Sequence, residues 1–295
     1  MKNKLNVVRT VVAMSTLLSL ALLAVPVGAA PADRLVSNVR DDVTIFVPST
    51  AVDNSSVISL GTTVDPSTGQ VVEGLAIIHY KEGFSHKPNH PNKGGKPGGN
   101  TANSCFSYLA KGAEWKVFGE DYVVDPSNTR ELSEAGVRAI MANGIDQWED
   151  AADGTLNDET GVDVFGDENL AKTVNRATIG DLNGENEVMF ASISNPGVIA
   201  VTYVWGIFRG PPFGRELVEW NMVFDDVDFD WSTTGDLNAM DFENIAVHEL
   251  GHAFGMGHAS DSTCSEETMY PTASLGETLK RDLNTGDIAG IDGLY

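Results

Sequence analysis

The stretch HELGHAFGMGH at residues 248–258 brings three of the chain's six histidines close together. His248 and His252 are four residues apart, so on an α-helix their side chains lie on the same face, one turn apart. Both imidazoles can therefore reach one metal ion. Glu249 is rotated by about 100° from His248 around the helix axis, which places its carboxylate beside such an ion. That position suits a general base acting on a metal-bound water.

Gly255 predicts how the third histidine joins the other two. It follows His252 by three residues, where a helix C-terminus commonly needs a left-handed residue that glycine adopts at low cost. We expect the chain to turn there and to return His258 toward His248. Three neutral imidazoles and one water form the open, four-coordinate site of a catalytic zinc. The pattern therefore predicts a zinc site with His248, His252 and His258 as ligands, suited to amide hydrolysis.

The spacing H-E-x-x-H-x-x-G-x-x-H, followed by a methionine in ETMYP, resembles that of the metzincin metallopeptidases. The Met-Tyr-Pro run at 269–271 is most similar to the matrixins. The resemblance implies a zinc-dependent endopeptidase in which Glu249 is general base and later proton donor. It also implies that Met269 forms a hydrophobic floor under the zinc; a methionine that only fills the core would look the same. Ala259 stands where a matrixin has serine, so the subfamily stays open.

The resemblance covers about residues 105–295. DLNTGDIAGIDGLY at 282–295 resembles the last matrixin helix, and we expect no further domain after it. The stretch 125–152 resembles the first long helix. Its apolar residues recur at helical spacing, namely Val137, Ile140, Met141, Ile145 and Trp148. The predicted fold class is α+β: a metzincin-like domain with a twisted mixed sheet, two long helices and a C-terminal helix.

The sheet is expected from β-branched and aromatic segments between these helices. They are NEVMFASI at 186–193 and GVIAVTYVWGIF at 197–208. In EWNMVFDDVDFDWST the apolar alternation slips by one residue near Asp225 and Asp226, which predicts a bulge or bend. By resemblance, residues 197–203 would form the edge strand above the cleft, where an extended peptide can pair by β-augmentation; core packing is the alternative reading. The predicted partners are proteins or peptides in extended conformation.

The N-terminus has the layout of a secretory signal peptide. Basic residues precede an apolar stretch at 11–27, and small residues follow in VGAAPA. We assign residues 1–29 to the signal peptide, with cleavage after Ala29 or Ala32, and expect a secreted protein without a stable membrane anchor. An uncleaved anchor is the alternative.

Residues 30–104 form an N-terminal extension or a propeptide, and the sequence leaves both open. The segment ends in a Pro/Gly-rich linker that has too few apolar residues to pack a core. Its His86 and His90 are expected to be solvated rather than metal-bound. The matrixin Arg-Cys-Gly-x-Pro-Asp motif is absent, which argues against cysteine-based latency. Between His90 and His248 there is no histidine for the second, structural zinc of matrixins, so we expect one zinc only.

The formal net charge of −23 excludes nucleic acid as a natural partner and favours cation binding. Asp181, Asn183 and Glu185 alternate in a glycine-containing loop and are candidates for the structural calcium that the resemblance implies. A solvated acidic surface is the alternative reading.

Cys105 and Cys264 are the only two cysteines of the chain. An even count in an exported protein predicts a disulfide between them. The bridge would tie the start of the peptidase domain to the loop between His258 and Met269. The alternative is that Cys105, as a thiolate, caps the zinc as a fourth ligand.

Two other functions fit the same motif. The domain could be a binding module with a relic site, although the intact Glu249 argues against this because the base is usually lost first. It could also be an amidase acting on peptidoglycan or small peptides. The sequence favours a secreted zinc endopeptidase.

Overall fold

The computed structural model describes residues 43–47, 56–84, 105–158 and 160–295. All of them belong to one compact unit of the chain. The predicted signal peptide, His86 and His90 lie outside the described residues. Within the described ranges, no helix has the length and apolar character needed to cross a bilayer.

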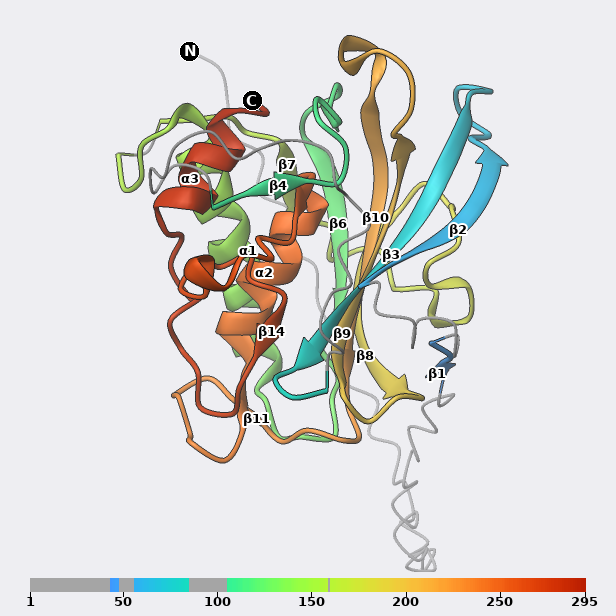
Figure 1. Cartoon of the computed structure of the whole chain (residues 1–295). Helices are drawn as coiled ribbons and strands as arrows, with labels where there is room; N and C mark the ends of the chain where they lie inside the picture. The colour runs from blue at the N-terminus through green and yellow to red at the C-terminus, as the bar shows by residue number, and fades with distance from the viewer. Residues whose placement is uncertain (1–42, 48–55, 85–104, 159) are drawn as a thin grey trace, which may run out of the picture. The chain divides into compact units, whose positions relative to one another are not determined.

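A ten-stranded mixed sheet runs through this unit (Figure 1), in the order β14-β3-β9-β10-β8-β6-β7. β1 pairs with β8, β2 with β3 and β5 with β10. β9 is antiparallel to both of its neighbours, whereas β10, β8, β6 and β7 are mutually parallel. The strands of this sheet are β1 Thr44–Ile45, β2 Val57–Val64, β3 Val71–Lys81, β5 Glu114–Trp115, β6 Glu120–Asp125, β7 Phe165–Glu168, β8 Asn186–Ile193, β9 Val198–Ile207, β10 Glu216–Asp225 and β14 Thr272–Ala273.

Two short strand pairs complete the β-structure. They are β11 Trp231–Ser232 with β12 Met240–Asp241, and β13 Met256–Gly257 with β4 Ser107–Tyr108. In the second pair, β13 comes shortly after the helix that carries the first two motif histidines.

Three α-helices lie together on one face of the sheet, as Figure 1 shows. They are α1 Glu134–Asp150, α2 Phe242–Ala253 and α3 Thr285–Asp292. Ser133 and Asp241 cap α1 and α2, since their side chains accept hydrogen bonds from backbone N–H groups of the first turn. The predicted fold class is confirmed: the domain is α+β, with a mixed sheet, two long helices and a short C-terminal helix.

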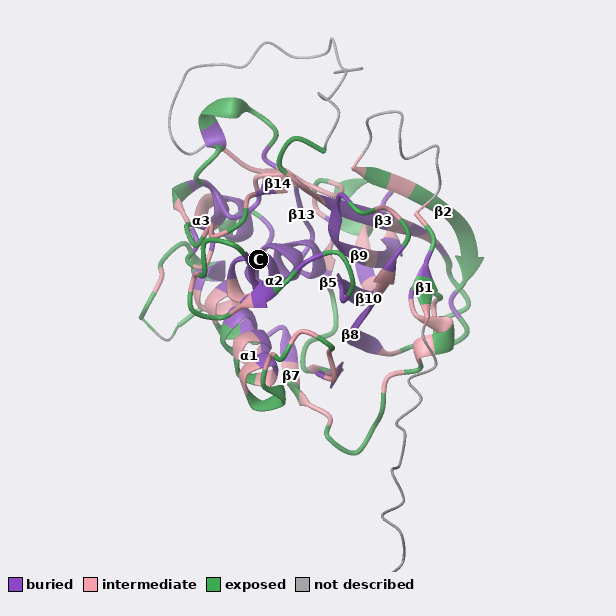
Figure 2. Cartoon of the chain, turned by 90° about the horizontal axis from the view of Figure 1, so that it is seen from below, coloured by how far each residue is buried: buried purple, intermediate pink, exposed green. Residues whose placement is uncertain are grey.

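The predicted apolar face of α1 packs against α2. Val137, Met141, Ile145 and Trp148 are all buried. The indole N–H of Trp148 donates to the carbonyl of Val247 over 2.8 Å, so one polar bond fixes the two helices where their apolar faces meet. Figure 2 shows α2 as a mainly buried helix.

The slip in apolar alternation marks the end of a strand. β10 ends at Asp225, whose Oδ1 accepts the N–H groups of Val227 and Asp228. This local bonding turns the chain away from the sheet. The predicted irregularity is therefore a bend, while the register shift of β10 lies farther back, between Leu217 and Glu219.

The expected edge strand is not at the edge of the sheet, and this prediction was wrong. β9 contains the predicted stretch, but it lies between β10 and β3. β3 comes from the range 30–104 that we assigned to the N-terminal extension. β3 forms a hairpin with β2 and pairs with β9 on the side that faces away from β10.

Cys105 and Cys264 form a disulfide, with their Cα atoms 5.4 Å apart. The bridge joins the segment before β4 to the loop that follows the histidine motif. Because the sulfur of Cys105 is bonded to Cys264, it is not available as a thiolate. The alternative in which Cys105 caps the zinc as a fourth ligand is therefore excluded.

We predict that the denatured, unreduced protein contains no free thiol in a thiol titration. Replacing both cysteines by serine should lower the free energy of unfolding by up to about 5 kcal/mol, because the bridge closes a long loop in the unfolded chain. Denaturant unfolding with and without reductant measures this. Reductant should destabilise the wild type and leave the double variant unchanged. Equal stability of the two proteins before reduction would contradict the prediction.

Candidate metal centre

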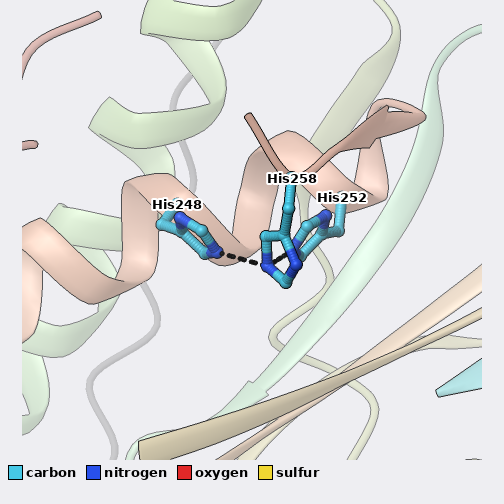
Figure 3. Close-up of side chains that lie close together, drawn as sticks. All are labelled: His248, His252 and His258. Carbon is cyan, nitrogen blue, oxygen red and sulfur yellow. Dashed lines mark hydrogen bonds between the residues drawn. The ribbon is translucent and has the colours of Figure 1, made fainter. Parts of the chain in front are cut away.

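Helix α2 and the turn after it bring the three histidines of the motif together (Figure 3). His248 and His252 lie on α2 and are fully buried. Gly255 follows with φ 102°, and a Cβ there would come within 2.7 Å of the carbonyl oxygen of Ala113. Only glycine meets both conditions at low cost. The predicted turn is present, and it returns His258 to the other two rings.

The ligand atoms of the three rings converge on one point. His258 Nε2 lies 3.2 Å from His248 Nε2 and 3.1 Å from His252 Nε2. The Nδ1 atom of His248 donates to the carbonyl of Thr268 over 2.6 Å, and that of His252 donates to the carbonyl of Met256 over 2.8 Å. A carbonyl can only accept, so these rings carry their protons on Nδ1 and their lone pairs on Nε2.

This arrangement fits a zinc ion. Lone pairs at such distances repel one another unless a cation lies between them. A tetrahedral zinc with Zn–N bonds of about 2.0–2.1 Å separates its ligand nitrogens by about 3.3 Å. The described residues therefore include a histidine triad that can hold a metal ion.

The surroundings keep the three imidazoles neutral, as metal binding requires. Desolvation by burial lowers the pKa of His248, His252 and His258, and it is the largest cause for each ring. The neighbouring imidazoles lower the pKa of His248 and His258 further.

Glu249 lies beside this triad and is fully buried. Its Oε2 accepts a hydrogen bond from the hydroxyl of Thr202 over 2.5 Å, and its Oε1 lies 2.9 Å from Nδ1 of His79. Burial raises the pKa of Glu249 to about 7. A carboxyl group with a pKa near neutrality can both take up and return a proton at neutral pH.

Met269 packs directly against α2. A Cβ on Gly251 would overlap the sulfur of Met269 and come within 2.7 Å of the Trp148 ring, so the absence of a side chain at 251 makes room for the methionine. The carbonyl of Met269 accepts the N–H of Ala259, the residue after the third histidine, over 2.8 Å.

Helix α3 holds this turn in place. The carboxylate of Asp287 accepts the N–H groups of Met269 over 3.1 Å and of Thr268 over 2.7 Å. The carbonyl of Thr268 in turn accepts the Nδ1 proton of His248. A continuous set of hydrogen bonds therefore connects α3 to the metal-facing imidazole and fixes its orientation.

Three residues of the site were not found from the sequence: His79 on β3, Thr202 on β9, and Ser56, whose hydroxyl lies 3.0 Å from His258 Nδ1. The ring of His79 stacks on His248 with centroids 3.9 Å apart, and burial lowers its pKa to about 3. The signal in the sequence was the single histidine within the apolar run LAIIHY.

Two of the calcium candidates contact each other, since Oδ1 of Asn183 accepts the N–H of Glu185 over 2.9 Å. Glu185 forms an ion pair with Lys172 over 2.6 Å. The backbone N–H of Asn183 donates to the buried carboxylate of Glu219 over 2.9 Å. Burial raises the pKa of the Tyr203 phenol, and the nearby carboxylate of Asp181 raises it further.

The matrixin family model matches residues 214–295, which contain β10, the three histidines, the methionine turn and α3. The chain is matrixin-like. It is 43% identical to Metalloendoproteinase 2-MMP of Arabidopsis thaliana over 77 residues, which is 24% of this chain and 19% of that protein. It is also 43% identical to human Matrilysin over 70 residues, 24% of this chain and 25% of that protein. This matrixin-like chain thus spans about a fifth to a quarter of the length of these relatives.

We predict that Gly251→Ala destabilises the protein by about 1–3 kcal/mol, because the added methyl group overpacks the contact between α2 and Met269. The matched control is Gly214→Ala, where a Cβ meets no atom within 4 Å and the backbone is unstrained. Thermal unfolding of the two variants measures the difference. Equal midpoints for both variants would show that Met269 does not depend on the missing side chain at 251.

Proposed function

We propose that the protein is a secreted zinc-dependent endopeptidase. The observation that carries the proposal is the convergence of three imidazole Nε2 atoms beside the buried carboxylate of Glu249. We assign His248, His252 and His258 as ligands of one zinc ion. Met269 is assigned as the support beneath them.

Bound in this triad, zinc would act as a Lewis acid and lower the pKa of a water molecule toward neutrality. Glu249 is placed to accept a proton from that water at its carboxylate and to deliver it to the leaving amine. Thr202 holds Oε2 of the carboxylate, which fixes the plane in which the other oxygen can act. The backbone partners of His248 and His252 hold both rings in the tautomer that presents Nε2.

The proposed substrates are proteins or peptides bound in extended conformation. Support comes from β9, whose side away from β10 pairs with the extended strand β3 and so presents backbone groups that suit an extended chain. We further propose that residues 1–29 direct export, that residues 105–295 form the peptidase domain, and that residues 30–104 precede it as an extension or a propeptide.

Calcium at the loop of Asp181, Asn183 and Glu185 also remains a proposal. Support comes from the acidic composition of the loop. Calcium should raise the thermal midpoint of the wild type, and Asp181→Asn should reduce that gain if this loop binds the ion.

We predict one zinc per chain by elemental analysis of the purified protein. Treatment with 1,10-phenanthroline should remove the metal and abolish peptide hydrolysis, and added zinc should restore it. His252→Ala should lose the metal, because two imidazoles remain in a site built for three. Hydrolysis that persists after complete removal of zinc would contradict the proposed function.

We predict that Glu249→Gln keeps the zinc but lowers turnover by roughly 100-fold or more, as expected for the loss of a general base. The control is Glu266→Gln, which changes an exposed glutamate outside the site. Casein and a cell-wall substrate should be assayed side by side, since cleavage of the cell wall alone would indicate an amidase. An unchanged rate for Glu249→Gln would mean that another group takes the proton.

A further inference from the structure

Strand β3 fills the space between the strand β9 and the methionine turn. It runs antiparallel to β9, with His79 opposite Ala200, and its end runs parallel to β14, with Tyr80 opposite Thr272. The N–H of Lys81 donates to the carbonyl of Gly197 over 2.9 Å. β3 therefore pairs with the backbones of both β9 and β14 (Figure 1). An extended peptide bound between these two strands would need the same backbone groups.

One side chain of β3, that of His79, reaches the metal centre. Ile77 packs in the main core, while Ile78 and Tyr80 belong to the opposite face of the sheet. The strand alternation thus points His79 toward α2, where it stacks on His248 and lies 2.9 Å from Glu249 Oε1. With Thr202 on Oε2, both carboxylate oxygens already have protein partners.

A second contact comes from the start of the same hairpin. Ser56, immediately before β2, lies with its hydroxyl 3.0 Å from Nδ1 of His258. The hairpin therefore touches two of the three candidate zinc ligands and the candidate base.

We propose that the hairpin of residues 56–81 is an intramolecular inhibitor, in which β3 occupies the peptide site and His79 occupies the reaction position beside Glu249. The proposal rests on the proposed function. Because β3 belongs to the same chain, an external peptide must displace an intramolecular competitor. Only the fraction of molecules with β3 released can then bind substrate.

Two substitutions in the full-length protein test the proposal, one through the packing of β3 on β9 and one through the side chain of His79. Gly74→Val acts outside the metal centre. A Cβ at 74 would come within 2.7 Å of the Trp205 ring on β9, so the valine side chain should displace β3 from β9. His79→Ala removes the ring beside Glu249 and leaves the strand backbone in place. The matched control for the first variant is Gly214→Val, at a position where a Cβ meets no neighbour within 4 Å.

The first readout is independent of catalysis. Each protein is loaded with Co²⁺ in place of zinc and titrated with acetohydroxamate, while the visible d–d bands report binding at the metal. We expect both Gly74→Val and His79→Ala to bind acetohydroxamate about tenfold tighter or more than the wild type, as for release of a site that is open in a tenth of molecules or fewer. Gly214→Val should match the wild type.

The second readout is the hydrolysis of a fluorogenic peptide by the zinc proteins. A rise of about tenfold or more in kcat/KM for Gly74→Val supports the inhibitor. His79→Ala should stay near the wild-type kcat/KM, because its β3 backbone still fills the peptide site. If acetohydroxamate binding tightens but no protein cleaves peptides, occlusion by β3 stands and the endopeptidase function fails. If His79→Ala leaves acetohydroxamate affinity at the wild-type value, β3 does not block the centre and the proposal is overturned, whether or not Gly74→Val folds.

Discussion

The structure depends on holding the Nε2 atoms of His248 and His252 at 3.2 and 3.1 Å from Nε2 of His258 in a buried site. Such an arrangement is unfavourable without a cation, because the lone pairs repel and the rings have lost their hydration. Metal binding in sites of this kind contributes directly to folding free energy. The rest of the domain can be understood as the framework that keeps His248, His252 and His258 from separating.

That framework acts through few contacts, and most of them are local to the C-terminal third of the chain. Gly255 permits the turn that returns His258, and Gly251 gives Met269 its place against α2. Asp287 fixes the backbone of the methionine turn from α3. The disulfide of Cys105 and Cys264 ties the same loop to the start of the domain.

The turn at Gly255 could be predicted because it depends on spacing along a short stretch of sequence, and the disulfide because the chain has only two cysteines. The contact of Gly251 with Met269 and the hydrogen bonds of Asp287 were not predicted, because they join segments that only the fold brings together. The helical period placed His248 and His252, and a glycine at a helix end predicted the turn. The position of β3 depends instead on pairing between Val71–Lys81 and Val198–Ile207, segments more than a hundred residues apart. The sequence of an apolar strand does not specify which other strand it pairs with. His79 could therefore not be placed beside Glu249 from the sequence. The stretch 197–203 was expected at the edge of the sheet from the resemblance to matrixins, but β3 pairs with it on the side away from β10.

Zinc K-edge X-ray absorption of the purified full-length protein tests the central claim most directly, because it counts the ligands of the bound ion. The account predicts three imidazole nitrogens and one further light atom at about 2.0–2.1 Å, with no sulfur. His258→Ala should remove one imidazole from the fit or release the metal. A fit with sulfur at about 2.3 Å, or with fewer than three imidazoles in the wild type, would contradict the account.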